Sequence, residues 1–197
     1  ATVADVFAAA VTCAREAGAR YVAGDIGPIG ALLRPLGTLS FDEAYDLFAE
    51  EVRAGVDASV DLFIIETMTD LAEIKAAVLA CRENSDLPVF ATMTFEEDGR
   101  TFLGTSPEVA AITLDAIGAD VLGINCSQGP AELRGLAARM LTVTDKPIMV
   151  QANAGLPHVD DDGNTVFDIQ APEYAKAVAG MIADGVRFMR EGSNRNR

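Results

Sequence analysis

The chain has 197 residues, half of them hydrophobic, so it is long enough for one well-buried core and too short for two domains of typical size. Its 30 acidic and 15 basic residues give a net charge of −15, and this negative field disfavours nucleic acid or an anionic membrane surface as a partner. The composition favours a small neutral or zwitterionic ligand instead.

Helical and strand patterns alternate along the chain. Apolar residues at helical spacing predict a first helix over residues 3–16, and a short strand follows over 21–25. Ser40 is the expected N-cap of a helix over 41–55, with Glu43 completing a capping box. The remaining predicted strands cover residues 62–66, 89–94, 121–126, 148–153 and 186–189, and the remaining predicted helices cover 70–82, 106–117, 130–141 and 172–184.

The spacing of the predicted strands indicates a parallel α/β fold. Strands begin about every 30 to 40 residues, which is the length of a βα unit with a right-handed crossover. A closed barrel has eight such units in about 250 residues. We therefore expect a (β/α)8 TIM barrel that is incomplete in this chain, with about six βα units.

An open doubly wound sheet is the alternative fold. It often carries a glycine-rich phosphate loop after its first strand, and residues 24–30 are the candidate segment. Their glycines do not follow the GxGxxG pattern, and Pro28 removes a backbone donor where a phosphate would need one. The partial barrel is therefore the favoured prediction.

Several predicted strands end in polar residues. Glu66, Thr94, Asn125, Cys126 and Asn153 each lie at or just after the end of an apolar run. In an α/β barrel the carboxyl ends of all the parallel strands open onto one face. We expect these side chains to converge on a single pocket.

Five segments of the chain form a distinctive series: Gly24-Asp25-Ile26-Gly27-Pro28, Ile65-Glu66-Thr67-Met68-Thr69-Asp70, Gly99-Arg100-Thr101-Phe102-Leu103-Gly104-Thr105, Gly123-Ile124-Asn125-Cys126-Ser127-Gln128-Gly129-Pro130 and Asn153-Ala154-Gly155-Leu156-Pro157. In this order they resemble the homocysteine S-methyltransferase family, and in particular the homocysteine-binding barrels of cobalamin-dependent methionine synthases. The resemblance implies a partial barrel domain over residues 1–189 and leaves 190–197 as a tail, either a linker or an artefact. It also implies that the intact domain binds zinc through three cysteine thiolates and methylates homocysteine to methionine.

Zinc explains the need for thiolates in such a site. A free thiol has a pKa of about 8.5, whereas a thiol coordinated to a metal loses its proton and becomes a nucleophile. A catalytic zinc keeps one position open beside three protein ligands. By resemblance Cys126 is the first zinc ligand, although a lone cysteine after a buried strand is more often a packed apolar residue. Cys13 and Cys81 match no family motif and are expected to be core or surface thiols.

The resemblance also assigns residues to the substrate. Glu66 is expected to receive the ammonium group of homocysteine, where the plain alternative is a carboxylate that caps a helix or pairs with a lysine. Asn153 is expected beside the zinc, although an asparagine before Ala-Gly commonly serves only a turn. Asp25, Thr94 and Asn125 are further substrate-binding candidates at strand ends. Asp25 and Thr94 could instead only orient loops.

The end of the chain departs from the family pattern. The family continues its last strand into Gly-Gly-Cys-Cys-Gly-Thr, which supplies two zinc ligands, whereas residues 190–197 contain no cysteine, and the family's N-terminal Asp-Gly strand is absent. We expect this polypeptide to carry one of three zinc ligands and to have little or no activity as a fragment. The alternatives are a catalytically dead scaffold or interaction domain and, less favoured, another barrel enzyme such as a lyase with Glu66 as base.

Further expectations concern partners and compartment. Three widely spaced cysteines without a CxxC pair or a secretory leader indicate a reduced, cytoplasmic protein, and no apolar run approaches the roughly 18 residues of a membrane span. The expected substrate is homocysteine, with cobalamin or methyltetrahydrofolate handled by other modules. Self-association is expected through exposed strand edges. We expect His158 to be solvated and residues 160–164 to form a turn, because they do not fit a calcium loop.

Overall fold

The computed structural model describes residues 1–155, 157–159, 163–167 and 169–190, and in this part of the chain helices and strands alternate as predicted. The helices are α1 (Val3–Glu16), α2 (Phe41–Asp57), α3 (Leu71–Asn84), α4 (Pro107–Ala116), α5 (Pro130–Leu141) and α6 (Ala171–Asp184). The strands are β1 (Ala23–Ile26), β2 (Leu62–Met68), β3 (Val89–Met93), β4 (Val121–Asn125), β5 (Ile148–Gln151), β6 (Pro157–Val159), β7 (Thr165–Phe167) and β8 (Phe188–Met189).

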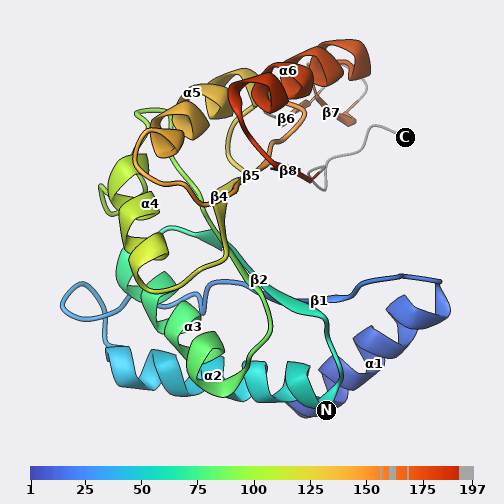
Figure 1. Cartoon of the computed structure of the whole chain (residues 1–197), viewed down its shortest axis with the longest axis vertical. Coiled ribbons are helices and arrows are strands. Elements are labelled where there is room, and N and C mark those ends of the chain that lie inside the picture. The colour runs from blue at the N-terminus through green and yellow to red at the C-terminus, as the bar shows by residue number, and fades with distance from the viewer. Residues whose placement is uncertain (156, 160–162, 168, 191–197) are drawn as a thin grey trace.

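Six of the strands form one parallel sheet in the order β1-β2-β3-β4-β5-β8. Each strand pairs with the strand before it in this series, and the order never reverses. A doubly wound sheet requires such a reversal, so that alternative is excluded. Figure 1 shows the helices on the outer side of a curved arc, with α1 and β1 at one end and α6 and β8 at the other.

The curvature of the sheet identifies it as part of a barrel. In a flat sheet β2 and β8 would be four strand spacings, or about 19 Å, apart. Instead, Arg190, directly after β8, bonds to Glu66 on β2, and the rings of Phe90 on β3 and Phe188 on β8 lie 5.2 Å apart, centroid to centroid. These contacts cross the concave side of the sheet. The prediction of an incomplete (β/α) barrel with six parallel strands is therefore confirmed.

Local sequence signals account for the starts of the helices. Ser40 caps α2, and its backbone N–H donates to Glu43 Oε2 at 2.8 Å, which completes the predicted capping box. Asp70, predicted as the first residue of its helix, is the N-cap of α3 and accepts from the backbone N–H of Ala72 at 2.7 Å. Since a capping side chain satisfies a free backbone donor, these residues fix where each helix begins.

The core lies between the sheet and the outer helices. Phe63 and Ile65 on β2 have no exposed surface, and Phe63 packs so closely on α2 that a Cβ added to Gly55 would lie 2.7 Å from its Cε1 atom. The intervening residues of the strand, Ile64 and Glu66, face the concave side because side chains alternate along a strand. The same alternation directs the polar strand ends toward the barrel interior.

The structure differs from the sequence prediction at the C-terminal end of the described chain. Strands β6 and β7 form an antiparallel hairpin that the sequence analysis missed, since each has only three residues. His158 on this hairpin is exposed, as expected. The predicted turn falls partly on residues 160–162 and most of the predicted tail falls on 191–197, and both lie outside the described residues. Among the described helices, none is long and apolar enough to cross a membrane.

The two edge strands lead to a prediction about the 197-residue polypeptide. In the described sheet β1 pairs only with β2, and β8 pairs only with β5, so each strand has one row of backbone groups without a strand partner. Such edges associate with other chains unless they are covered. We expect the purified polypeptide to self-associate despite its charge of −15, and light scattering over a range of protein concentrations measures this. A concentration-independent monomer with a reversible melt would contradict the prediction.

Candidate functional site

The polar ends of the strands meet on the concave side of the sheet. Asn125, at the end of β4, is the centre of the group and has no exposed surface. Its Oδ1 accepts from the backbone N–H of Thr67 at 2.9 Å and from Thr92 Oγ1 at 2.8 Å. Its Nδ2 donates to Thr67 Oγ1 at 2.7 Å and to Cys126 Sγ at 3.2 Å. One side-chain amide therefore joins β2, β3 and β4.

Asn125 thus has a positioning role that the sequence did not indicate. An amide group has two N–H donors and an oxygen with two acceptor positions, and protein partners use all four here. Buried polar groups with complete hydrogen bonding hold neighbouring elements in one arrangement. The predicted contact of Asn125 with substrate stays a prediction.

Cys126 lies beside this amide in an unusual backbone conformation. Its φ is 61°, and Ser127 and Thr67 have φ values of 52° and 66°. Residues other than glycine adopt such values at a cost and tend to do so at functional sites. The Cys126 thiol is partly exposed, and its Sγ atom lies 3.9 Å from Thr67 Oγ1. The strained loop after β4 therefore presents the thiol next to the end of β2.

Glu66, one residue before Thr67, is the more buried of two interior carboxylates, and its side chain is 17% exposed. Burial raises its pKa, and the neighbouring Asp25 carboxylate at the end of β1 raises it further. Asp25 is more exposed, but partial burial still raises the pKa of its carboxyl group. The site therefore holds two adjacent carboxylates that favour a cationic partner.

Arg190 supplies a cation to these carboxylates from the opposite edge of the sheet. Its Nη1 donates to Glu66 Oε2 at 2.7 Å, and its positive charge lowers the pKa of both Glu66 and Asp25, against the effect of burial. The guanidinium-bearing side chain is 45% exposed. The plain alternative for Glu66, a carboxylate paired with a basic residue, is thus present, with an arginine in place of the lysine.

The other two predicted residues lie at the edge of this group. Thr94 is buried, and its Oγ1 donates to the backbone oxygen of Asn125 at 3.0 Å. Asn153 follows β5, is half-buried, and its backbone N–H donates to the backbone oxygen of Gln128 at 3.2 Å. The structure therefore brings Asp25, Glu66, Thr94, Asn125 and Cys126 onto one face, with Asn153 in the adjoining loop.

Sequence reasoning missed Gln151, which pairs in register with Asn125 and is 5% exposed. Its Oε1 atom is buried without a hydrogen-bond partner among the described residues. Its position at the end of β5 and the alternation of the strand could have identified it as an interior residue. Arg190 could not have been found in this way, because its partner is 124 residues away.

The described residues do not form a complete zinc site. No group of three or more His, Cys, Asp or Glu side chains with metal-binding geometry occurs in this part of the chain. Cys13 is exposed on α1, and Cys81 is buried on α3, where burial raises the pKa of its thiol to about 12. A catalytic zinc needs three protein ligands, and of the three cysteines only Cys126 lies at the strand ends.

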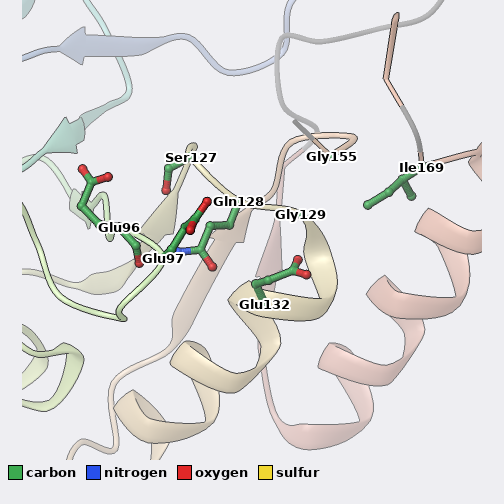
Figure 2. Close-up of a pocket in the computed structure, with 8 residues that line it drawn as sticks. All are labelled: Glu96, Glu97, Ser127, Gln128, Gly129, Glu132, Gly155 and Ile169. Atoms are coloured by element: carbon green, nitrogen blue, oxygen red, sulfur yellow. Dashed lines mark hydrogen bonds between the residues drawn. The ribbon is translucent and has the colours of Figure 1, made fainter. Parts of the chain in front are cut away.

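A separate cavity of about 510 Å³ adjoins the loop after Cys126. Figure 2 shows Glu96, Glu97 and Glu132 around it, with Gln128 at its wall and helix α5 beginning beneath it. Gln128 is buried, and its Nε2 donates to the backbone oxygens of Phe95 and Glu96 at 3.1 and 2.6 Å. The side chain thus holds the loop after β3 against the start of α5.

The chain is similar in sequence to known proteins. The sequence profile described as homocysteine S-methyltransferase matches residues 1–189. Methionine synthases from Mycobacterium leprae (strain TN) and Mycobacterium tuberculosis (strain ATCC 25618 / H37Rv) are each 34% identical over 170 residues, which is 84% of this chain and 14% of each relative. The chain therefore spans about one seventh of the length of these curated relatives.

A solved structure shares the fold. The apo form of the homocysteine methyltransferase MmuM from Escherichia coli aligns with a TM-score of 0.77 at 19% identity, over 98% of this chain and 70% of that chain. At this identity the likeness supports the fold only. It agrees with the curvature and strand order of the six-stranded sheet.

Proposed function

This chain belongs to the homocysteine S-methyltransferase family, and from that premise we propose that it forms the homocysteine-binding part of an enzyme that makes methionine. The observation that carries the proposal is the convergence of Glu66, Asp25 and Cys126 at the carboxyl ends of the barrel strands. An amino acid with a thiol requires partners for an ammonium group and for sulfur, and this face offers both kinds. We propose residues 1–189 as the domain that supplies Glu66, Asp25 and Cys126 for this role, with Arg190 directly at its end.

In the proposed reaction the homocysteine thiol gives up its proton and its sulfur forms a bond to the methyl carbon. The bond between methyl group and donor breaks, and its electron pair stays on the donor. Glu66 and Asp25 would bind the ammonium group and so fix the amino-acid end of the substrate. Thr94 and Asn125 would hold the loop that carries Cys126, through the hydrogen bonds already described.

We propose zinc as the metal of the intact protein, with Cys126 as one ligand and Asn153 close by. The described residues supply only this one thiol at the site. We further propose that methyl-donor modules carrying cobalamin or methyltetrahydrofolate act with this domain. A reducing, cytoplasmic setting fits a protein with three unpaired cysteines and a thiol substrate.

The test uses a longer form, in which the chain is extended with the N-terminal strand and the Gly-Gly-Cys-Cys-Gly-Thr motif of the family pattern. L-homocysteine is supplied with methylcobalamin or with methyltetrahydrofolate, and methionine is measured by mass spectrometry. Methionine above the protein-free control supports the proposal. If homocysteine binds to that form neither in the presence nor in the absence of a donor, the proposed substrate is wrong.

A catalytically dead scaffold is the second candidate, and two observations favour it. One thiol cannot hold a catalytic zinc by itself, and Arg190 already occupies the Glu66 carboxylate. Both candidates share the barrel and differ in whether the protein binds a metal. Metal content therefore separates them in the longer form.

For the 197-residue polypeptide itself we expect zinc well below one equivalent. Tight catalytic and structural zinc sites use three or four protein ligands, and among the described residues Cys126 is the one thiol at the site. The measurement is elemental analysis after dialysis against a chelator. Close to one zinc per chain, retained through that dialysis, would show that other residues complete the ligand set.

A further inference from the structure

Arg190 and Glu66 form an ion pair across the barrel interior. Arg190 is the first residue after β8, and its backbone N–H donates to the oxygen of Val150 on β5 at 3.1 Å, which fixes where the side chain starts. From there Nη1 reaches Glu66 Oε2 at 2.7 Å. The contact joins the last strand of the sheet to its second strand.

The guanidinium stands where a ligand ammonium group would bind. The charge of Asp25 acts on Glu66, and the charge of Arg190 acts on both carboxylates. A simple amine that enters must displace Arg190 from Glu66, and it has no carboxylate that could pair with the displaced guanidinium. Since the hydrogen bonds of the amine to Glu66 only replace those of Arg190, the net free energy of binding is small.

An α-amino acid can pair with both Glu66 and Arg190. Its ammonium and carboxylate groups are attached to the same carbon, so it can insert between Glu66 and Arg190 and bind both. Arginine binds carboxylates well because its planar guanidinium presents several parallel donors. The Arg190 side chain is 45% exposed, so it can move aside without leaving a buried charge unpaired.

We propose that Arg190 is a specificity-determining residue that makes this site select α-amino acids over simple amines. In the free site it pairs with Glu66, and in the occupied site it binds the ligand carboxylate while Glu66 and Asp25 bind the ammonium group. This inference rests on the proposed function, because it takes the ligand to be an amino acid bound through Glu66.

The experiment compares L-methionine with 3-(methylthio)propylamine, which is the same molecule without its carboxylate. Binding of both to the 197-residue chain is measured by calorimetry in zinc-free buffer. The unmodified chain should bind methionine at least about tenfold more tightly than the amine, as expected for one charge-assisted pair. In Arg190→Gln this preference should fall to within about threefold, in part because the amine binds more tightly.

Arg187→Gln is the matched control. It removes the same charge three residues away and should keep the preference of the unmodified chain. Glu66→Gln should weaken the binding of both compounds, and a thermal melt of each variant by circular dichroism checks that it is folded. An unchanged preference in Arg190→Gln, no preference in the unmodified chain, or a preference lost equally in Arg187→Gln would each overturn the inference.

L-alanine distinguishes failure of this inference from failure of the proposed function. If alanine binds as tightly as methionine with the same dependence on Arg190, the selection for amino acids stands and the proposed substrate is wrong. If methionine binds more tightly than alanine but its preference over the amine does not depend on Arg190, the inference fails and the proposed substrate stands. Absence of methionine binding to the unmodified chain overturns the inference, and homocysteine binding to the longer form then decides the proposed function separately.

Discussion

Cys126→Ser is expected to abolish both zinc binding and methionine formation in a longer form of the protein that binds zinc. A serine hydroxyl stays protonated near neutral pH and is a poor replacement for a soft thiolate ligand. Among the described residues, Cys126 carries the only thiol beside the polar strand ends of the barrel interior. Zinc is measured by elemental analysis and methionine by mass spectrometry.

Two variants make this result specific. Cys13→Ser changes an exposed thiol on α1 and should leave zinc and activity unchanged. Glu66→Gln should keep zinc but weaken homocysteine binding by about 1.5–3 kcal/mol, the range for a hydrogen bond to a charged group. Zinc loss in Glu66→Gln together with zinc retention in Cys126→Ser would reverse the assigned roles of the two residues.

The part of the fold that depends on local signals was predictable from the sequence. The capping box of Ser40 and Glu43 occurs as predicted because both partners lie within one turn of the chain. The parallel strands occur near their predicted positions because most of them are short apolar runs that alternate with helices. The ends differ by one or two residues, for example at Asp70, since a cap and a first helical residue look alike in sequence.

The arrangement of the site was predictable only in part. Strand ends in a barrel share one face, which is why Glu66, Asn125 and Cys126 come together as expected. The pairing of Arg190 with Glu66 depends on the curvature of the whole sheet and on residues 124 apart, and no local pattern encodes it. The hydrogen bonds of Asn125 likewise depend on the register of β2, β3 and β4, which a single sequence does not specify.

Those hydrogen bonds lead to a prediction about stability. In Asn125→Ala the backbone N–H and the hydroxyl group of Thr67 lose their amide partner beside a fully buried position. The hydroxyl group of Thr92 loses its 2.8 Å bond to the amide and keeps only the 3.4 Å contact with the backbone oxygen of Ile65. Each unsatisfied buried group costs about 1–3 kcal/mol, and some relaxation or water entry offsets part of this.

We therefore expect Asn125→Ala to lower the free energy of unfolding by about 3–5 kcal/mol, which is large for a single substitution. Urea denaturation followed by circular dichroism gives the difference. The control is Thr94→Val, which removes a single hydrogen bond to the backbone oxygen of Asn125 and should cost only about 1 kcal/mol. Equal losses in the two variants would mean that the amide does not join the three strands in solution. A larger loss in Asn125→Ala would identify this amide as the group that holds the Cys126 loop in position against β2.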